Sequence, residues 1–124
     1  MVILVDTDVI IDFLRSKDKK TTTFHKLFID SSNEAVISFV TKIELLAGMD
    51  SENPGKKNII KKLLGSVEVL ESNESFCEVA GEILRHHSVS FQDALIASHS
   101  IAASLPLLTR NKQDFAKIAG VRLY

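Results

Sequence analysis

Four acidic residues stand at positions where their carboxylates could act together. The four are Asp6, Glu44, Asp93 and Asp114. Asp6 directly follows the apolar run 2–5, which predicts a buried strand, and Asp114 comes soon after the apolar run 106–108. In an open α/β sheet, ligands bind beyond the carboxyl ends of the strands, at the point where the strand order reverses. Carboxylates at two such ends are therefore well placed for chemistry.

Asp6 and Asp8 each allow two interpretations. Asp8 stands where the helix predicted over 9–15 begins, and its carboxylate would cap that helix by accepting backbone N–H groups. For Asp8 we prefer this capping role to a role in chemistry. For Asp6, which ends an apolar strand, we prefer the functional role.

Glu44 lies in a segment that is predicted to be a helix, 40–49. It flanks the apolar stripe of that helix, and its neighbours one turn away are the small residues Thr41 and Gly48. Small neighbours let this face approach another element closely. A solvated glutamate is the ordinary explanation for Glu44 taken alone. The predicted apolar stripe consists of Val40, Ile43, Leu46 and Ala47.

Asp93 and Asp114 each stand three residues after a potential helix N-cap, Ser90 and Asn111 respectively. This is the spacing of a capping box, and capping alone would explain either acid. The helix near Asp93 also carries a face of small residues, which would let it press against the sheet and hold Asp93 near Asp6. That face consists of Asp93, Ala97, Ser100 and Ser104.

Strands alternate with helices along the chain, which predicts a parallel α/β sheet covered by helices. The predicted strands are 2–5, 35–37, 67–70, 106–108 and 121–123. The predicted helices are 9–15, 20–30, 40–49, 56–64, 74–87, 92–104 and 112–119. The segment 50–55 is rich in turn-forming residues and predicts a surface loop.

The composition fits a single domain that spans residues 1–124. The net charge of −1 lacks the basic excess that usually marks a nucleic-acid binder. The single cysteine, Cys77, allows no internal disulfide, and no apolar run approaches the roughly 18 residues that span a bilayer. The first residues lack the basic region of a signal peptide, so we expect a cytoplasmic protein that does not enter a membrane.

As a set, these motifs resemble those of the PIN-domain family, which includes the VapC-type toxin ribonucleases. The sequence departs from the usual pattern in a shorter connection before Asp93 and in Asp8, which replaces a more common Asn. Both departures leave the four acids in place. The resemblance covers the opening segment 3–13 (ILVDTDVIIDF), the segments 41–48 (TKIELLAG), 93–97 (DALIA) and 107–115 (LLTRNKQDF), and the closing strand 121–123.

The resemblance implies a three-layer α/β sandwich with a central parallel sheet of about five strands. It implies that the four acids converge around Mg²⁺ or Mn²⁺, with Asp6 and Asp93 as inner ligands. Glu44 and Asp114 would hold water on the metal, position a second ion or assist deprotonation. Three further side chains would support these acids: Asp8, Thr109 and Asn111.

The function implied by the resemblance is that of a metal-dependent endoribonuclease that leaves a 5′-phosphate and a 3′-hydroxyl. Such a protein would act as the toxin of a toxin–antitoxin pair. The implied partners are an RNA substrate, a small antitoxin protein and a second copy of the chain in a homodimer.

Electrostatics favours a metal without reference to any family. Two carboxylates about 4 Å apart repel by about 4 kcal/mol at an effective dielectric constant of about 20. A cluster of them must therefore be protonated, separated or neutralised by a cation. Oxygen ligands favour Mg²⁺ or Mn²⁺, which lower the pKa of a bound water and stabilise charge on phosphoryl oxygens. The cations that could contact RNA phosphates, or could simply be solvated, are Arg15, Arg85, Arg110 and Lys112.

Three other functions are compatible with parts of the sequence. A PIN-like protein that binds partners without catalysis would keep the same fold. The opening 3–10 also resembles that of haloacid-dehalogenase-like phosphatases, with Asp6 as the nucleophile and Asp8 as the acid, but the paired acids of that family are missing after Thr109. A response-regulator receiver would use Asp50 as the phosphoacceptor, but Asp50 ends a predicted helix rather than a strand.

Overall fold

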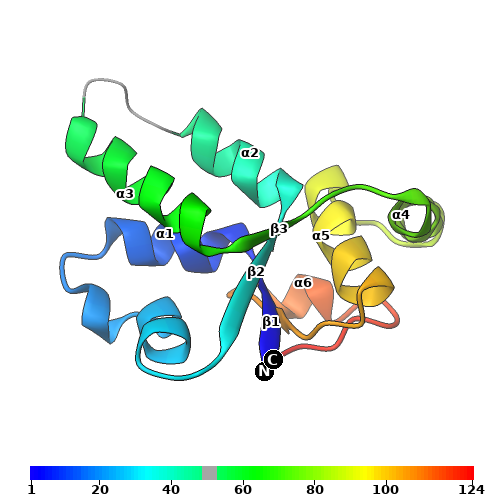
Figure 1. Ribbon diagram of the computed structural model, residues 1–124. Helices are drawn as coiled ribbons and strands as arrows, with labels where there is room; N and C mark the ends of the chain where they lie inside the picture. Colours follow the sequence, from blue (N-terminus) through cyan, green and yellow to red (C-terminus); the bar gives the residue numbers. More distant parts are fainter. Residues whose placement is uncertain (49–52) are drawn as a thin grey trace.

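The computed structural model of the protein describes residues 1–48 and 53–124. Within them, the strands are β1 (Val2–Val5), β2 (Glu34–Ser38), β3 (Glu68–Leu70) and β4 (Leu107–Leu108). They form one parallel sheet in the order β3-β2-β1-β4 (Figure 1). The chain begins in β1, adds β2 and β3 on one side, and returns to the other side with β4. The strand order therefore reverses between β1 and β4.

Helices cover both faces of this sheet, as Figure 1 shows. One buried apolar cluster joins the sheet to α1 (Thr7–Arg15), α2 (Phe39–Ala47) and α3 (Pro54–Ser66). The other joins it to α4 (Glu74–His86), α5 (Phe91–Ala102) and α6 (Lys112–Phe115). The predicted three-layer α/β sandwich is thus confirmed.

β1 is covered on both faces, which explains its unbroken apolar sequence. Ile3, Leu4 and Val5 are all fully buried. Ile3 and Val5 join the cluster with α1–α3, while Leu4 joins the cluster with α4–α6. Burying each such side chain contributes roughly 1.5–3 kcal/mol. The strand that ends in Asp6 is therefore a rigid support for that residue.

The fifth predicted strand, 121–123, is not a strand in the structure. Leu123 forms a single parallel bridge with Leu107, whose backbone bonds to Arg122 and Tyr124 on either side. Immediately before this segment, Gly120 adopts a φ of 94°, a left-handed conformation that favours glycine. This turn leaves only one residue in register with β4.

Two predicted helices are shorter or broken. The segment 20–30 forms a 3₁₀ turn, η1 (Lys19–Thr21), and a π-helical turn, η2 (His25–Ile29). Between them Thr22 is extended and its hydroxyl donates to Lys19 O, which ends the first turn. α6 stops at Phe115 instead of continuing to 119, because the backbone tightens into i to i+3 hydrogen bonds there.

The predicted apolar stripe of α2 is wrong. Thr41 and Leu45 face the interior, whereas Ile43 and Leu46 are 59% and 45% exposed. Thr41 reaches the interior because its hydroxyl lies 2.9 Å from that of Thr7 in α1. The segment thus has an outward apolar face that periodicity alone assigned to the core.

The predicted surface loop 50–55 and the end of the helix predicted over 40–49 lie partly outside the described residues. From Asn53 onward the chain is described, and Asn53 caps α3 by accepting the backbone N–H of Lys56. In the described part of the chain, no helix combines the length and the apolar character needed to cross a bilayer.

Candidate active site

Asp6 is the N-cap of α1 and lies where the strand order reverses. Its Oδ1 accepts the backbone N–H of Thr7 at 2.8 Å, and its Oδ2 accepts the hydroxyl of Thr109 at 2.7 Å. Thr109 directly follows β4, so the two sides of the switch point meet at this carboxylate. The capping role predicted for Asp8 is therefore wrong, because the preceding acid performs it.

Burial makes Asp6 costly to ionise. The residue is only 6% exposed, and this burial raises its pKa from 3.8 to about 6. The hydrogen bonds from Thr109 and Thr7 oppose the shift, while the negative charges of Asp8 and Asp93 add to it. Asp6 is thus a partly desolvated carboxylate with acids around it.

Asp8 connects α1 to the loop that follows β4. Both of its carboxylate oxygens accept the backbone N–H of Arg110, at 3.3 and 3.1 Å. The guanidinium of Arg110 bonds in turn to Asp12, one turn further along α1, at 3.2 Å. Asp8 therefore fixes the start of the loop that leads from Thr109 to Asp114.

Glu44 is anchored by two polar side chains from two other helices. Its Oε1 accepts from the hydroxyl of Thr7 at 2.9 Å and from the amide of Gln92 at 2.7 Å. Since the Thr7 proton is used here, the hydroxyl of Thr41 donates to Thr7. Glu44 is thus held in a hydrogen-bonded network and is not a freely solvated glutamate.

Thr7, Thr41 and Gln92 were not among the predicted site residues. Two of them stand next to predicted acids in the sequence, since Thr7 follows Asp6 and Gln92 precedes Asp93. Their position next to a predicted acid was the only sequence signal that could have pointed to Thr7 and Gln92. Thr41 stands one turn before Glu44 in the sequence, but its hydrogen bond to Thr7 exists only because α1 and α2 pack together.

Asp93 lies in the first turn of α5. Ser90 caps that helix by accepting the backbone N–H of Asp93 at 3.0 Å, as predicted. Desolvation raises the pKa of Asp93, with the charges of Asp114 and Asp8 adding to the effect and Ser90 opposing it. The small face predicted for this helix is buried at Ala97 and Ser100, while Ser104 is exposed.

Asp114 is held from both sides at the surface. Asn111 donates its side-chain amide to Asp114 Oδ2 at 3.0 Å, and Lys117 lies 3.7 Å from Oδ1. The backbone N–H of Asn111 donates to the hydroxyl of Thr109. The predicted supporting residues Thr109 and Asn111 therefore form one connected turn that runs from Asp6 to Asp114.

The four acids share one edge of the sheet without forming a tight cluster. Among residues 1–48 and 53–124, no three His, Cys, Asp or Glu side chains come close enough to hold a metal ion together. The donors are nonetheless all oxygens, and Mg²⁺ is commonly held by one or two carboxylates and several waters. The buried Asp6 and the nearby Asp93 fit such an ion.

The four predicted phosphate contacts lie in different places. Arg110 and Lys112 belong to the turn next to the acids, and Arg15 ends α1 and lines a groove with Glu44. Arg85 lies in the last turn of α4.

The chain is similar to known proteins over almost its whole length. The family model described as PIN domain matches residues 3–121. The chain is similar to the tRNA(fMet)-specific endonuclease VapC of Shigella flexneri, with 23% identity over 126 residues, or 96% of this chain and 93% of that protein. The match gives no support to the phosphatase or receiver interpretations.

Solved structures show the same fold. VapBC2 from Rickettsia felis, bound to a DNA fragment from their promoter, gives a TM-score of 0.82 at 21% identity, covering 100% of this chain and 98% of that one. DNA-bound VapBC from Salmonella typhimurium gives 0.82 at 23% identity, with coverage of 100% and 98%.

Proposed function

Because the chain belongs to the PIN-domain family, we propose that it is a divalent-metal-dependent endoribonuclease and the toxin of a toxin–antitoxin pair. One observation carries the catalytic part. Asp6 is a buried carboxylate at the switch point of the sheet, and the negative charge of Asp93 contributes to raising its pKa. A buried acid with like-charged neighbours is costly unless a proton or a cation neutralises it. This arrangement supports metal-dependent hydrolysis of a phosphodiester.

In this proposal, Asp6 and Asp93 hold Mg²⁺ or Mn²⁺. Glu44 and Asp114 hold water on the metal, position a second ion or assist deprotonation. The ion, when bound, supplies a water of lowered pKa and positive charge toward the phosphoryl oxygens. The protein's own contribution is orientation. Thr7 and Thr109 each bond one oxygen of Asp6, so that its carboxylate cannot rotate away. Cleavage leaves a 5′-phosphate and a 3′-hydroxyl.

The proposed partners are an antitoxin protein and a second copy of the chain. The antitoxin is proposed because the structural neighbours from Rickettsia felis and Salmonella typhimurium are VapBC assemblies. The homodimer is supported by the outward apolar face of α2, where Ile43 and Leu46 are exposed. Apolar side chains grouped on one helix face are a common feature of protein interfaces.

The test is cleavage of RNA by the purified chain with and without millimolar Mn²⁺ or Mg²⁺. Initiator transfer RNA is the first substrate to try, since the relative from Shigella flexneri is named for it. We expect Asp6→Asn and Asp93→Asn to abolish cleavage while the protein stays folded. Asp30→Asn, which changes an exposed acid bonded to His25, serves as the matched control.

Two outcomes would contradict the proposal. Full activity of Asp6→Asn or Asp93→Asn, with contaminating nuclease excluded, would remove these residues from the metal site. No cleavage of any RNA by the wild type, together with stable binding of an antitoxin, would favour a PIN-like protein that acts through partners alone.

A further inference from the structure

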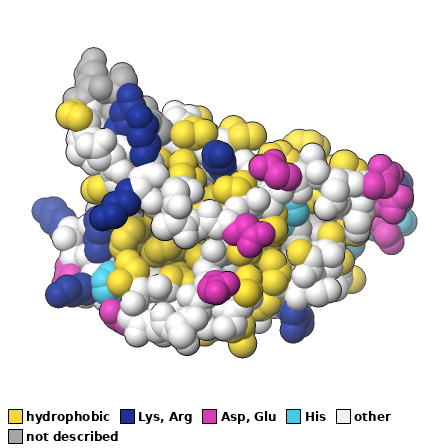
Figure 2. Space-filling model, viewed as in Figure 1, with side chains coloured by type: hydrophobic (Ala, Val, Ile, Leu, Met, Phe, Trp, Pro, Cys, Tyr) yellow, Lys and Arg dark blue, Asp and Glu magenta, His cyan; other side chains and the backbone are white. Residues whose placement is uncertain are grey.

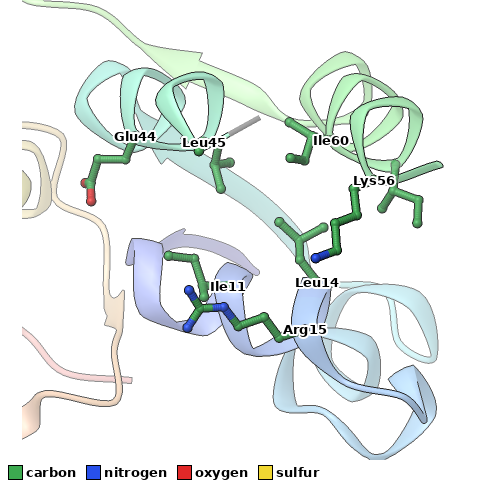
Figure 3. A pocket seen from close by; sticks show the side chains of 9 residues that line it. Ile11, Leu14, Arg15, Glu44, Leu45, Lys56 and Ile60 are labelled. Carbon is green, nitrogen blue, oxygen red and sulfur yellow. The ribbon is translucent and has the colours of Figure 1, made fainter. Parts of the chain in front are cut away.

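A groove between α1, α2 and α3 begins at the acidic site (Figure 3). Its volume is about 200 Å³, and Glu44 lines the end where α2 meets the other acids. Most of its wall is aliphatic. Apart from Glu44 and Gly48, the lining residues are Ile11, Leu14, Leu45, Ile59 and Ile60, together with two cations, Arg15 and Lys56.

Each of the two cations stands at a helix position that faces the groove, in line with an aliphatic residue one turn away. Arg15 follows Ile11 by one turn of α1, and Lys56 precedes Ile60 by one turn of α3, so each extends the row that faces the groove. Figure 3 shows Lys56 reaching from α3 toward α1, while the guanidinium of Arg15 ends beside Ile11, between Lys56 and Glu44. The two helices thus place two positive charges along an otherwise aliphatic channel.

Helix stability does not explain Lys56. It lies in the first turn of α3, where a positive charge opposes the helix dipole. α3 carries four lysines and no acid, and Figure 2 shows dark blue side chains gathered over it at the upper left. Among the described residues, neither Lys56 nor Arg15 forms an ion pair. The four lysines are Lys56, Lys57, Lys61 and Lys62.

We propose that this groove binds the RNA strand on one side of the bond to be cleaved, with backbone phosphates held by Arg15 and Lys56. The inference rests on the proposed ribonuclease function and adds Lys56 and the groove to it. A polyanion is the occupant that the charges favour. The lining residues include no aromatic ring for base stacking, so contact through phosphates predicts little sequence preference within the groove.

The test measures binding separately from cleavage. In the Asp6→Asn background, a fluorescently labelled single-stranded RNA of about 12 nucleotides is titrated at several salt concentrations. Each lost phosphate contact lowers the slope of log affinity against log salt by about 0.7 for single strands. We therefore expect the magnitude of this slope to fall by about 0.7 for Lys56→Gln or Arg15→Gln and by about 1.4 for the double variant. The same slope corresponds to roughly fivefold weaker binding per variant at about 0.1 M salt, if affinities converge near 1 M.

Arg122→Gln is the matched control, because it also removes one exposed positive charge. Arg122 is two residues from the C-terminus, which Figure 1 places below the sheet and away from α3, and it donates to Ser104 O. We expect its slope to equal that of the parent. A melting curve separates binding from folding. Lys56→Gln should melt at or slightly above the parent temperature, because it removes a charge that opposes the dipole, whereas a structural lysine would lower it.

Three results would overturn the proposal. Equal slopes for the double variant and Arg122→Gln would mean that the groove does not hold phosphates. If the groove variants bind RNA as tightly as the parent but bind an acidic glutamate–leucine peptide more weakly, the groove would be assigned to a protein segment. If the wild type cleaves RNA while groove variants keep their KM, the groove proposal fails and the ribonuclease proposal stands; if the wild type neither binds nor cleaves RNA, both fail.

Discussion

The side-chain amide of Gln92 in α5 donates a hydrogen bond of 2.7 Å to Oε1 of Glu44 in α2. Thr7 in α1 donates to the same oxygen at 2.9 Å. Oε1 thus has two donors. Three helices are joined through one carboxylate oxygen, which makes Gln92 a positioning residue for Glu44.

We predict that Gln92→Met lowers kcat for RNA cleavage about tenfold with little change in KM. Methionine keeps the length of the side chain but cannot donate, and a hydrogen bond to a charged group is worth at least about 1.5 kcal/mol. Gln92→Glu should lower kcat further, because two carboxylates then face each other. Steady-state kinetics of the three proteins tests this. Wild-type kcat in Gln92→Met would show that Thr7 alone positions Glu44.

The raised pKa of Asp6 predicts a pH-dependent stability. Its pKa is about 6 in the folded chain and 3.8 ordinarily, so the folded state binds this proton more tightly than the unfolded state. The stability from this group is therefore fully present below about pH 4 and is lost as the pH rises to about 6. This difference in pKa between the folded and unfolded chain corresponds to about 3 kcal/mol of stability.

Asp6→Asn removes this titration, and urea unfolding at pH 4 and pH 7 measures the effect. We expect the variant to gain up to about 3 kcal/mol over the wild type at pH 7, less any loss from altered bonds to Thr7 and Thr109. At pH 4 it should gain nothing. A difference between the two proteins that does not change with pH would contradict the buried-acid interpretation.

A divalent ion should stabilise the folded chain without RNA present. If only the folded state binds Mn²⁺ or Mg²⁺, a concentration 100 times the Kd adds about 2.7 kcal/mol. For a domain of this size the melting temperature then rises by roughly 8–15 °C. Asp93→Asn should raise the metal-free melting temperature, because it removes one of several like charges, and should reduce the response to metal. Asp30→Asn should do neither. The idea fails if wild-type melting ignores both ions.

The exposed face of α2 predicts an interface. We expect the wild type to sediment as a dimer and Ile43→Glu/Leu46→Glu to sediment as a monomer. Because both side chains are exposed in the single chain, the double variant should keep the melting temperature of an isolated protomer. Exchanging two other exposed residues, Ile29 and Leu84, for glutamate provides a control of equal charge. A wild type that is monomeric at micromolar concentration would remove the dimer from the proposal.

Local sequence carried enough information for β1 to β4 and for the position of Asp6, but it also predicted a strand over 121–123 that does not form. A continuous apolar run such as Ile3–Val5 is stable only with both faces covered, so it predicts a central strand whatever surrounds it. An acid directly after that run must lie at the carboxyl end of the strand. Local capping chemistry also placed Asp93 in the first turn of α5, where Ser90 accepts its backbone N–H. Asn111 precedes α6 as predicted, but its side chain makes no capping bond and donates to Asp114 instead.

The tertiary structure decided what local patterns leave open. Asp8 suits a helix cap by sequence, but Asp6 takes that role and Asp8 bonds the backbone of Arg110, 102 residues away. The helix of Glu44 has apolar residues on more than one side, so periodicity could not choose the buried one. Thr41 faces inward because Thr7 offers it a hydrogen-bond partner across the helix interface. Such choices depend on which polar groups meet after the chain has folded, and no spacing within one segment contains that information.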